Sequence, residues 1–365
     1  MKLAEKLATE KGEKDTQVIK SLQETIQALT QQNAPKYNIQ QAFDRLAQGD
    51  TTQAEAIFAG VAEEARQAGK EANIKEAEAL RHLGSLAFLH DTQKALAAYQ
   101  RSTGLDLDNL GGWNNLGYLY RRIGKLEKAE NAYTTMQKLS LLQLNRAGEA
   151  AAYGNLGDVY RIRGELERAI EYFEKALSIN QVLGCKEGMA NQYSNLGIVY
   201  QIHGELDCAV EYYEKALNIN QELGCKEGMA ITYGNLGIVY KTRGELDRAI
   251  EYYEKALSID QELGRKEGMA ITYGNLGDVY RIRDELECAV EYHEKALSID
   301  KEMGNKEYMA SDYSDLGIVY QTRGELDRAL KYWKQSLVLL QQLGANDKIA
   351  LVQSWIDEAE QKDSN

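Results

Sequence analysis

The sequence has few prolines, cysteines and histidines, and each shortage excludes a class of protein. A single proline, Pro35, leaves long stretches in which helices can run without interruption. The four cysteines form no CxxC pair and show no Cys/His ligand spacing, so we expect free thiols and no metal site. The four histidines lie in different parts of the chain. No nucleophile elbow, phosphate-binding loop or HExxH motif occurs, so we expect no enzyme and no cofactor.

Long apolar runs and positive charge are also missing. No run of about 18 apolar residues occurs, which argues against a membrane span. The first residues, MKLAEKLATEKGEKD, lack the apolar core of a secretory signal, and we expect a cytoplasmic protein. The formal net charge of −13 argues against nucleic acid as the main partner, because phosphate binding needs a positive field.

What the sequence does contain is one segment written several times. The segment ANQYSNLGIVYQIHGELDCAVEYYEKALNINQELGCKEGM begins at Ala190, and close copies begin at Ala230 and Ala270. A glycine preceded by Asn-Leu or Asp-Leu recurs every forty residues, at Gly117, Gly157, Gly197, Gly237, Gly277 and Gly317. A fixed period in this range predicts stacked repeats, in which each unit packs mainly on its neighbours.

Each copy predicts two antiparallel helices. Tyr193, Leu196, Gly197 and Tyr200 fall on one face of a first helix, and the glycine in that face lets a second helix come close. The second helix is expected from about Glu205 to Leu223. Neither helix can bury its apolar face alone, so the next pair must cover it.

The turn between the two helices contains Gly204, which can adopt the left-handed conformation that ends a helix. Asp284 replaces this glycine in one copy and is expected to take that conformation less easily. Arginines recur just before the turn, and we interpret them as cations that offset the helix dipole. They are Arg163, Arg243, Arg283 and Arg323.

These residues resemble the tetratricopeptide repeat (TPR) family, whose pattern is a large aromatic, Leu-Gly, Tyr, a small residue, an aromatic and Ala. One copy supplies Tyr153, Leu156, Gly157, Tyr160, Ala169, Phe173 and Ala176. The resemblance covers about residues 37–344 and implies an all-α, right-handed superhelical solenoid of about eight stacked antiparallel helix hairpins.

This chain departs from the usual TPR unit in two respects. Its period is forty residues rather than about 34, and the segment QELGCKEGM stands where the family has a proline. Both helices are therefore expected to be longer, with Gly184, Gly224, Gly264 and Gly304 in the turns between units. This longer form looks most like the Pins/LGN adaptors and many bacterial TPR proteins.

The repeat pattern predicts four regions. Residues 1–34 form an N-terminal helical segment with a stripe of Val18, Leu22, Thr25 and Leu29. Residues 35–109 hold two degenerate units, residues 110–344 hold six regular units, and residues 345–365 form a capping helix and tail. The sequence does not tell whether residues 1–34 continue from a domain further upstream.

The resemblance implies that the first helix of each hairpin lines a concave groove and that the residue before Leu-Gly faces it. These residues form an asparagine column that ends in an aspartate: Asn115, Asn155, Asn195, Asn235, Asn275 and Asp315. An amide offers two donors and an acceptor, so a column of amides can hold a peptide backbone. The alternative is that each asparagine bonds within its own or an adjacent helix.

Two neighbouring columns vary between copies and are expected to select the partner. The residue after the conserved tyrosine is Arg161, Gln201, Lys241, Arg281 or Gln321. The residue after Leu-Gly is acidic at Asp158 and Asp278 and apolar at Ile198, Ile238 and Ile318. The Lys/Asn/Arg set partly resembles the carboxylate clamp by which some TPR domains hold acidic peptide ends.

The predicted function is a scaffold or adaptor that binds a peptide or helix of another protein in its concave groove. Two alternatives remain open. One is a regulatory sensor that changes superhelix shape on binding a peptide. The other is a self-assembling structural protein, a homo-oligomer formed through the N-terminal helix or the solenoid ends. The sequence does not name the partner or the biological process, and it does not tell whether every repeat is used.

Overall fold

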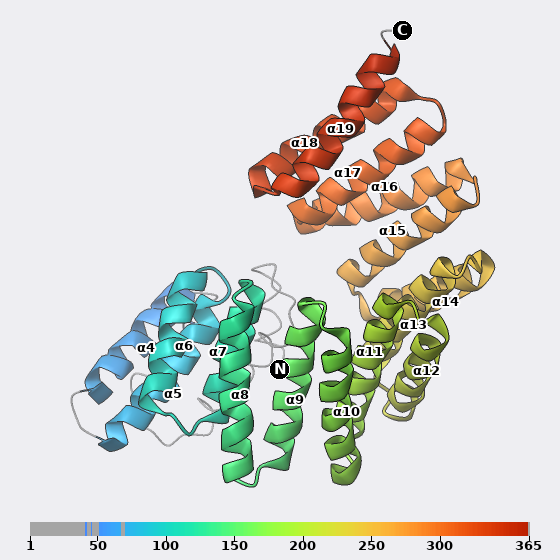
Figure 1. Ribbon diagram of the computed structural model, residues 1–365. Coiled ribbons are helices and arrows are strands. Elements are labelled where there is room, and N and C mark those ends of the chain that lie inside the picture. The colour runs from blue at the N-terminus through green and yellow to red at the C-terminus, as the bar shows by residue number, and fades with distance from the viewer. Residues whose placement is uncertain (1–40, 42–44, 46–50, 67–69, 364–365) are drawn as a thin grey trace. The chain divides into compact units, whose positions relative to one another are not determined.

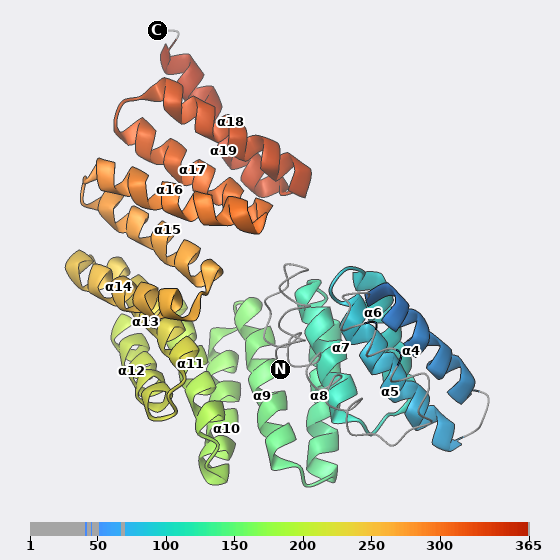
Figure 2. The same ribbon diagram turned by 180° about the vertical axis from the view of Figure 1, so that it is seen from behind.

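The structure is a computed structural model of the chain, and it describes residues 41, 45, 51–66 and 70–363 (Figure 1). This described part contains sixteen α-helices and no β-strand. The predicted all-α class of stacked antiparallel hairpins is therefore confirmed, and Figure 2 shows the same hairpins from behind.

The chain forms two compact units, Met1–Gly184 and Cys185–Asn365. In the first unit the helices are α4 (Thr51–Arg66), α5 (Lys70–Ala87), α6 (Thr92–Leu105), α7 (Leu110–Arg122), α8 (Leu126–Leu142), α9 (Arg146–Ile162) and α10 (Leu166–Leu183). In the second unit they are α11 (Lys186–His203), α12 (Leu206–Glu222), α13 (Lys226–Thr242), α14 (Leu246–Leu263), α15 (Lys266–Ile282), α16 (Leu286–Met303), α17 (Lys306–Thr322), α18 (Leu326–Leu343) and α19 (Asn346–Asp363).

Odd-numbered helices from α5 to α17 are the first helices of hairpins, and the even-numbered helices that follow them are the second helices. The first helices of the second unit begin at the lysine that follows the inter-repeat turn, as in α11 and α13. The helix α11, for example, begins at Lys186, ahead of the apolar pattern that starts at Ala190. The segment that replaces the family's proline is thus a short turn followed directly by helix.

Each hairpin closes where a glycine of the first helix meets an aromatic ring of the second. A Cβ added to Gly197 would lie 2.6 Å from the Tyr213 ring, and one added to Gly237 would lie 2.5 Å from the Tyr253 ring. Both tyrosines are fully buried. In the α15–α16 hairpin the ring at this position is His293. The glycine therefore sets the distance between the two helices, as the pattern predicted.

The turns inside the hairpins from α7 to α18 use the left-handed backbone conformation. Gly204 has a φ of 86° and ends α11. Asp284 takes the same conformation with a φ of 63°, although it carries a side chain. The substitution is thus accommodated by backbone strain at Asp284 rather than by a different turn.

The arginines before these turns do more than face a helix C-terminus. Arg243 pairs with Asp207 of the preceding hairpin at 2.5 Å, and Arg283 pairs with Asp247 at 2.7 Å. The interpretation of these arginines as dipole partners is therefore incomplete, because the same cations also connect consecutive hairpins.

The last helix, α19, covers the end of the second unit. Val352, Ile356 and Ala359 are buried against the α17–α18 hairpin. The rings of Trp355 and Trp333 lie 5.8 Å apart between centroids. This helix buries the apolar face that the last hairpin would otherwise expose.

The structure describes only part of the two N-terminal regions that the sequence predicts. The predicted stripe in residues 1–34 lies outside the described residues. Within the region predicted to hold two degenerate units, Ala54 and Phe58 are buried in α4.

Among the described helices, none is long and apolar enough to cross a membrane. All four cysteines carry free thiols. Cys185 and Cys225 are exposed, whereas Cys208 and Cys288 are half-buried.

Candidate binding surface

The first helices of consecutive hairpins approach one another. In the second unit α11 contacts α13, α13 contacts α15, and α15 contacts α17. Successive second helices in the described part do not contact one another to that extent. Elements on the inside of a curved stack are closer together than those on the outside. The first helices therefore lie on the inner side of the curvature within this unit.

One stripe of each first helix lies on this side. In α15 it consists of Ile271, Asn275, Asp278 and Ile282, which follow the helical spacing i, i+4, i+7 and i+11. We call this stripe, with its equivalents in α11, α13 and α17, the inner face of the second unit. Lys241 and Arg281 flank it.

The asparagine column lies in this stripe and is half-buried. In the first unit Asn155 donates from its amide nitrogen to the side-chain oxygen of Asn114 at 2.7 Å, so it is bonded to the adjacent first helix. In the second unit no hydrogen bond joins Asn195, Asn235 or Asn275 to any other side chain that the structure describes. The bonded alternative thus applies to Asn155, whereas the three amides of the second unit lack such a bond to the described side chains.

The cations of the variable column are held by aspartates of the chain itself. Arg161 bonds Asp158 at 2.9 Å, and Arg121 of the previous first helix reaches the same carboxylate at 3.5 Å. In the second unit Lys241 bonds Asp278 at 3.0 Å, and Arg281 lies 3.9 Å from it. An incoming carboxylate would therefore compete with Asp278 for both cations, which weighs against a ready-made carboxylate clamp.

The neutral members of this column have a different environment. Gln201 accepts a hydrogen bond from the Tyr213 hydroxyl at 3.0 Å, which connects the inner face to the ring beneath it. Gln321 occupies the same position in α17 and is half-buried. The column therefore changes from neutral to cationic and back to neutral along the second unit.

Asp315 is the last residue of the asparagine column, in α17, and its pKa is higher than the ordinary aspartate value. Burial raises the pKa of Asp315 to about 7, and the Asp278 carboxylate raises it further, whereas Arg281 and Lys241 lower it. A hydrogen bond from Ser311 also favours the ionised form. Near neutral pH this position is therefore populated both as a neutral acid and as an anion.

The sequence reasoning missed an apolar part of the inner face. Ile231 and Ile271 are 49% and 46% exposed, and Ile202 and Ile282 are 56% and 51% exposed. They stand four residues before or seven residues after the asparagine column, hence on the same side of the helix. That spacing was the signal that would have found them. The amide column is thus bordered by exposed isoleucines on both sides.

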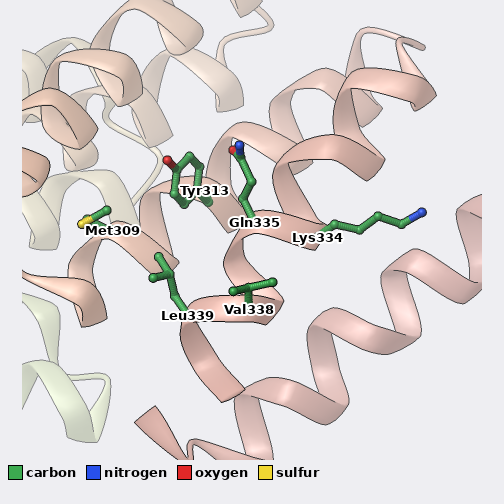
Figure 3. Close-up of a pocket in the computed structure, with 6 residues that line it drawn as sticks. All are labelled: Met309, Tyr313, Lys334, Gln335, Val338 and Leu339. Atoms are coloured by element: carbon green, nitrogen blue, oxygen red, sulfur yellow. The ribbon is translucent and has the colours of Figure 1, made fainter. Parts of the chain in front are cut away.

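A separate depression of about 420 Å³ lies between α17 and α18 (Figure 3). It is lined mainly by Met309, Tyr313, Val338 and Leu339, and the Lys334 side chain extends away from Tyr313. The lining offers no converging set of charged groups. This depression is therefore a weaker candidate than the inner face.

The repeat segment matches a family model described as tetratricopeptide repeat. The matches overlap and cover residues 111–181, 148–222, 188–262, 228–302 and 268–342. They include every regular hairpin from α7 to α18 and more than half of the chain. No curated protein sequence matches the chain significantly.

Several solved structures share the fold. The chain is similar to BtubC (BKLC) from P. vanneervenii, with 24% identity, a TM-score of 0.54, and coverage of 60% of this chain and 92% of that one. It is also similar to a signal transduction ATPase with numerous domains, with a tetratricopeptide repeat sensor, from Pyrococcus horikoshii (19% identity, TM-score 0.59). That match covers 79% of this chain but only 46% of the other. A Rap protein complexed with Competence and Sporulation Factor matches with 14% identity and a TM-score of 0.58, over 94% of this chain and 98% of that one.

Proposed function

Because the chain belongs to the tetratricopeptide repeat family, we propose that it is a protein-interaction scaffold whose inner face binds a peptide segment or helix of a partner protein. TPR proteins bind protein or peptide partners, and the family match supports a protein-interaction scaffold. The groove, its residues and the partner are our own proposal.

The proposal is based on two kinds of side chain that lie next to each other on the inner face: asparagine amides and exposed isoleucines. The side-chain amides of Asn195, Asn235 and Asn275 are half-buried and unbonded among the described residues, so they would pair with a peptide backbone at little desolvation cost. Ile231 and Ile271 beside them give apolar contact area to the side chains of the same peptide. A segment that combines apolar side chains with an accessible backbone fits this surface best.

The charges flanking the face add a preference. Lys241 and Arg281 are two cations that share one carboxylate, Asp278. When Asp315 is neutral this group carries a net positive charge, so it favours a partner with an acidic side chain between its apolar ones. Binding rather than catalysis is proposed because these ionised groups already pair with one another.

Affinity capture from the native lysate, followed by mass spectrometry, identifies the partner. The triple variant N195A/N235A/N275A then tests the site. Each lost hydrogen bond is worth about 1 kcal/mol, so together the three changes should weaken binding by about a hundredfold while the helix content stays unchanged.

The matched control uses one repeat position on the outside of the same hairpins. Asn218, Ser258 and Ser298 are exposed on the second helices, and N218A/S258A/S298A should retain the partner. Equal recovery of the partner by the two triple variants would remove the inner face as the site.

A second proposal is that the array is a peptide sensor. Two of the similar structures are a protein with a tetratricopeptide repeat sensor and a Rap protein complexed with Competence and Sporulation Factor, although their likeness shows the fold alone. Small-angle scattering with the identified peptide tests this alternative. Compaction on binding supports a sensor, and an unchanged profile with bound peptide supports a passive scaffold.

Two further proposals concern state and compartment. The free thiols of Cys185, Cys208, Cys225 and Cys288 fit a reducing compartment, which is consistent with a cytoplasmic location.

A homo-oligomer through the N-terminal segment or the ends of the stack is tested by light scattering over a range of concentrations. A constant monomer mass would exclude it.

A further inference from the structure

The joint between α16 and α17 carries aspartates where the other joints of the second unit carry mostly neutral residues. A joint here means the contact of a second helix with the next first helix. Three equivalent positions are Asn220, Thr232 and Asn235 in the α12–α13 joint, Asp260, Thr272 and Asn275 in the α14–α15 joint, and Asp300, Asp312 and Asp315 in the α16–α17 joint. One joint has therefore gained three carboxyl groups relative to its neutral copy.

Two of these carboxyl groups are buried and bonded to each other. Asp300 is 2% exposed and Asp312 is 7% exposed. Their side chains share a hydrogen bond. Two carboxylates cannot both be ionised at hydrogen-bond distance, so this bond requires a proton on one of them. The second oxygen of Asp312 has no hydrogen-bond partner among the described residues.

The α14–α15 joint shows how the chain neutralises a buried aspartate in another way. Asp260 is 3% exposed and is bonded by Arg265, whose guanidinium lies 3.0 Å from a carboxylate oxygen. In the α16–α17 joint the residue equivalent to Arg265 is Asn305, which instead caps α17 by accepting from the Tyr308 backbone at 3.3 Å. A proton therefore takes the place of the arginine at Asp300 and Asp312.

The charges around the cluster do not replace that proton. On Asp312, burial raises the pKa first, the Asp300 and Asp315 carboxyl groups raise it further, and Lys301 lowers it. On Asp315, the opposing cations are Lys241 and Arg281, both of which already face Asp278. Burial raises the pKa of Tyr308, and the charges of Glu267, Glu307 and Asp300 raise it further, so these acidic groups act across the joint.

We propose that the α16–α17 joint is a proton-dependent joint: one proton shared by Asp300 and Asp312, with a second proton on Asp315 beside them, holds α17 against α16, and the loss of these protons loosens the joint. As the same protons leave, Asp315 changes from a group that donates and accepts, like the asparagines of its column, into an anion that only accepts. The second statement rests on the proposed function. It implies that binding at this end of the inner face weakens as the pH rises.

The sign follows from linkage. The pKa of Asp312 and that of Asp315 are higher in the folded chain than the ordinary aspartate value of about 3.9. Above that value the unfolded chain has lost protons that the folded chain still binds, so folding stability falls as pH rises. For Asp315 the fall continues to about pH 7, and Asp312 extends it to higher pH.

The test needs no ligand. Thermal unfolding of the full chain is followed by circular dichroism from about pH 5 to about pH 9, together with the variant D300N/D312T/D315N, which installs the residues of the α12–α13 joint. We expect the unfolding midpoint of the natural chain to fall by several degrees over this range relative to the variant. A control, E254Q/E294Q/D327N, removes three exposed carboxylates and should follow the natural chain.

Two outcomes would overturn the proposal. One is a parallel pH dependence of the natural chain and D300N/D312T/D315N. The other is a carbon-13 carboxyl titration in which Asp312 and Asp315 both ionise near the ordinary aspartate value of about 3.9. That titration also gives a readout if the triple variant fails to fold. Because both measurements are made without a partner, they can fail while the proposed function stands, and the reverse also holds.

Discussion

Lys241 on α13 lies with its ammonium nitrogen 3.0 Å from a carboxylate oxygen of Asp278 on α15, so a single ion pair connects two first helices across the inner face. The same carboxylate lies 3.9 Å from the guanidinium of Arg281. Asp278 thus sets how much positive charge this part of the inner face presents to a partner and to Asp315.

Asp278→Asn should lower the pKa of Asp315. The Asp278 charge raises that pKa, and Lys241 and Arg281 lower it, so removing the carboxylate shifts the balance toward ionised Asp315. Carbon-13 NMR of labelled aspartate carboxyl groups measures the shift directly. Glu254→Gln, which makes the same charge change at an exposed site on α14, should leave the Asp315 titration unchanged. An equal shift in both variants would contradict the proposed contact.

His293→Phe should stabilise the protein. His293 is 1% exposed, and neither ring nitrogen has a hydrogen-bond partner among the described residues. Removing a buried polar group that lacks a partner should raise the free energy of unfolding by about 1–2 kcal/mol. The equivalent ring in the first unit, Phe173, shows that phenylalanine fits this position. Chemical denaturation near neutral pH measures the gain.

The same histidine predicts a pH dependence. Burial lowers the pKa of His293. Below the ordinary histidine pKa of about 6.5, the unfolded chain therefore binds a proton at this histidine that the folded chain does not bind. Stability should therefore fall as the pH drops below about 6.5, and His293→Phe should reduce that loss. His203→Gln, a change at an exposed histidine, should keep the loss. If both variants lose stability to the same extent, burial of His293 is not its cause.

Asp284→Gly should also stabilise the protein. Asp284 holds a φ of 63°, which favours glycine, and the other hairpins of the second unit have glycine there. Relieving the strain should be worth about 1 kcal/mol. The reverse change, Gly244→Asp, imposes the same strain at a φ of 77° and should cost a similar amount. Denaturation midpoints compare the two variants, and a loss of stability in Asp284→Gly would show that the carboxylate has another role.

Gly237→Ala should destabilise the α13–α14 hairpin. The added Cβ would lie 2.5 Å from the buried Tyr253 ring, so the two helices must separate at a cost of about 1–3 kcal/mol. Gly234→Ala on the same helix is the matched control, since no atom lies within 4 Å of its Cβ. There the higher helix propensity of alanine should add up to about 1 kcal/mol. Equal midpoints for the two variants would show that the glycine does not set the helix spacing.

The hairpins were predictable because their determinants are local and repeated. Gly197 and Tyr213 belong to one forty-residue unit, and the helical period places both on the faces that must meet. The turn at Gly204 was predictable for the same reason. The helical segment predicted for residues 1–34 lies outside the described residues. The four predicted region boundaries stay a prediction.

The contacts between units were not predictable from the sequence. Whether Asn155 bonds Asn114 or a ligand depends on the rotation of α9 against α7, which the helical period does not determine. The pairing of Arg243 with Asp207 depends in the same way on how two hairpins stack. The inner face was therefore predicted as columns of residues, while the state of each column had to come from the packing.

The ion pairs between hairpins have a consequence for how such a chain changes its length. Arg243 reaches Asp207, and Arg283 reaches Asp247, across the same number of residues. A forty-residue segment inserted by duplication would bring both halves of this contact with it, so a longer array would need no newly adapted interface. The number of hairpins is thus free to vary during evolution, while the substitutions within single copies, such as Asp300 and Asp312, give individual positions in the array their separate properties.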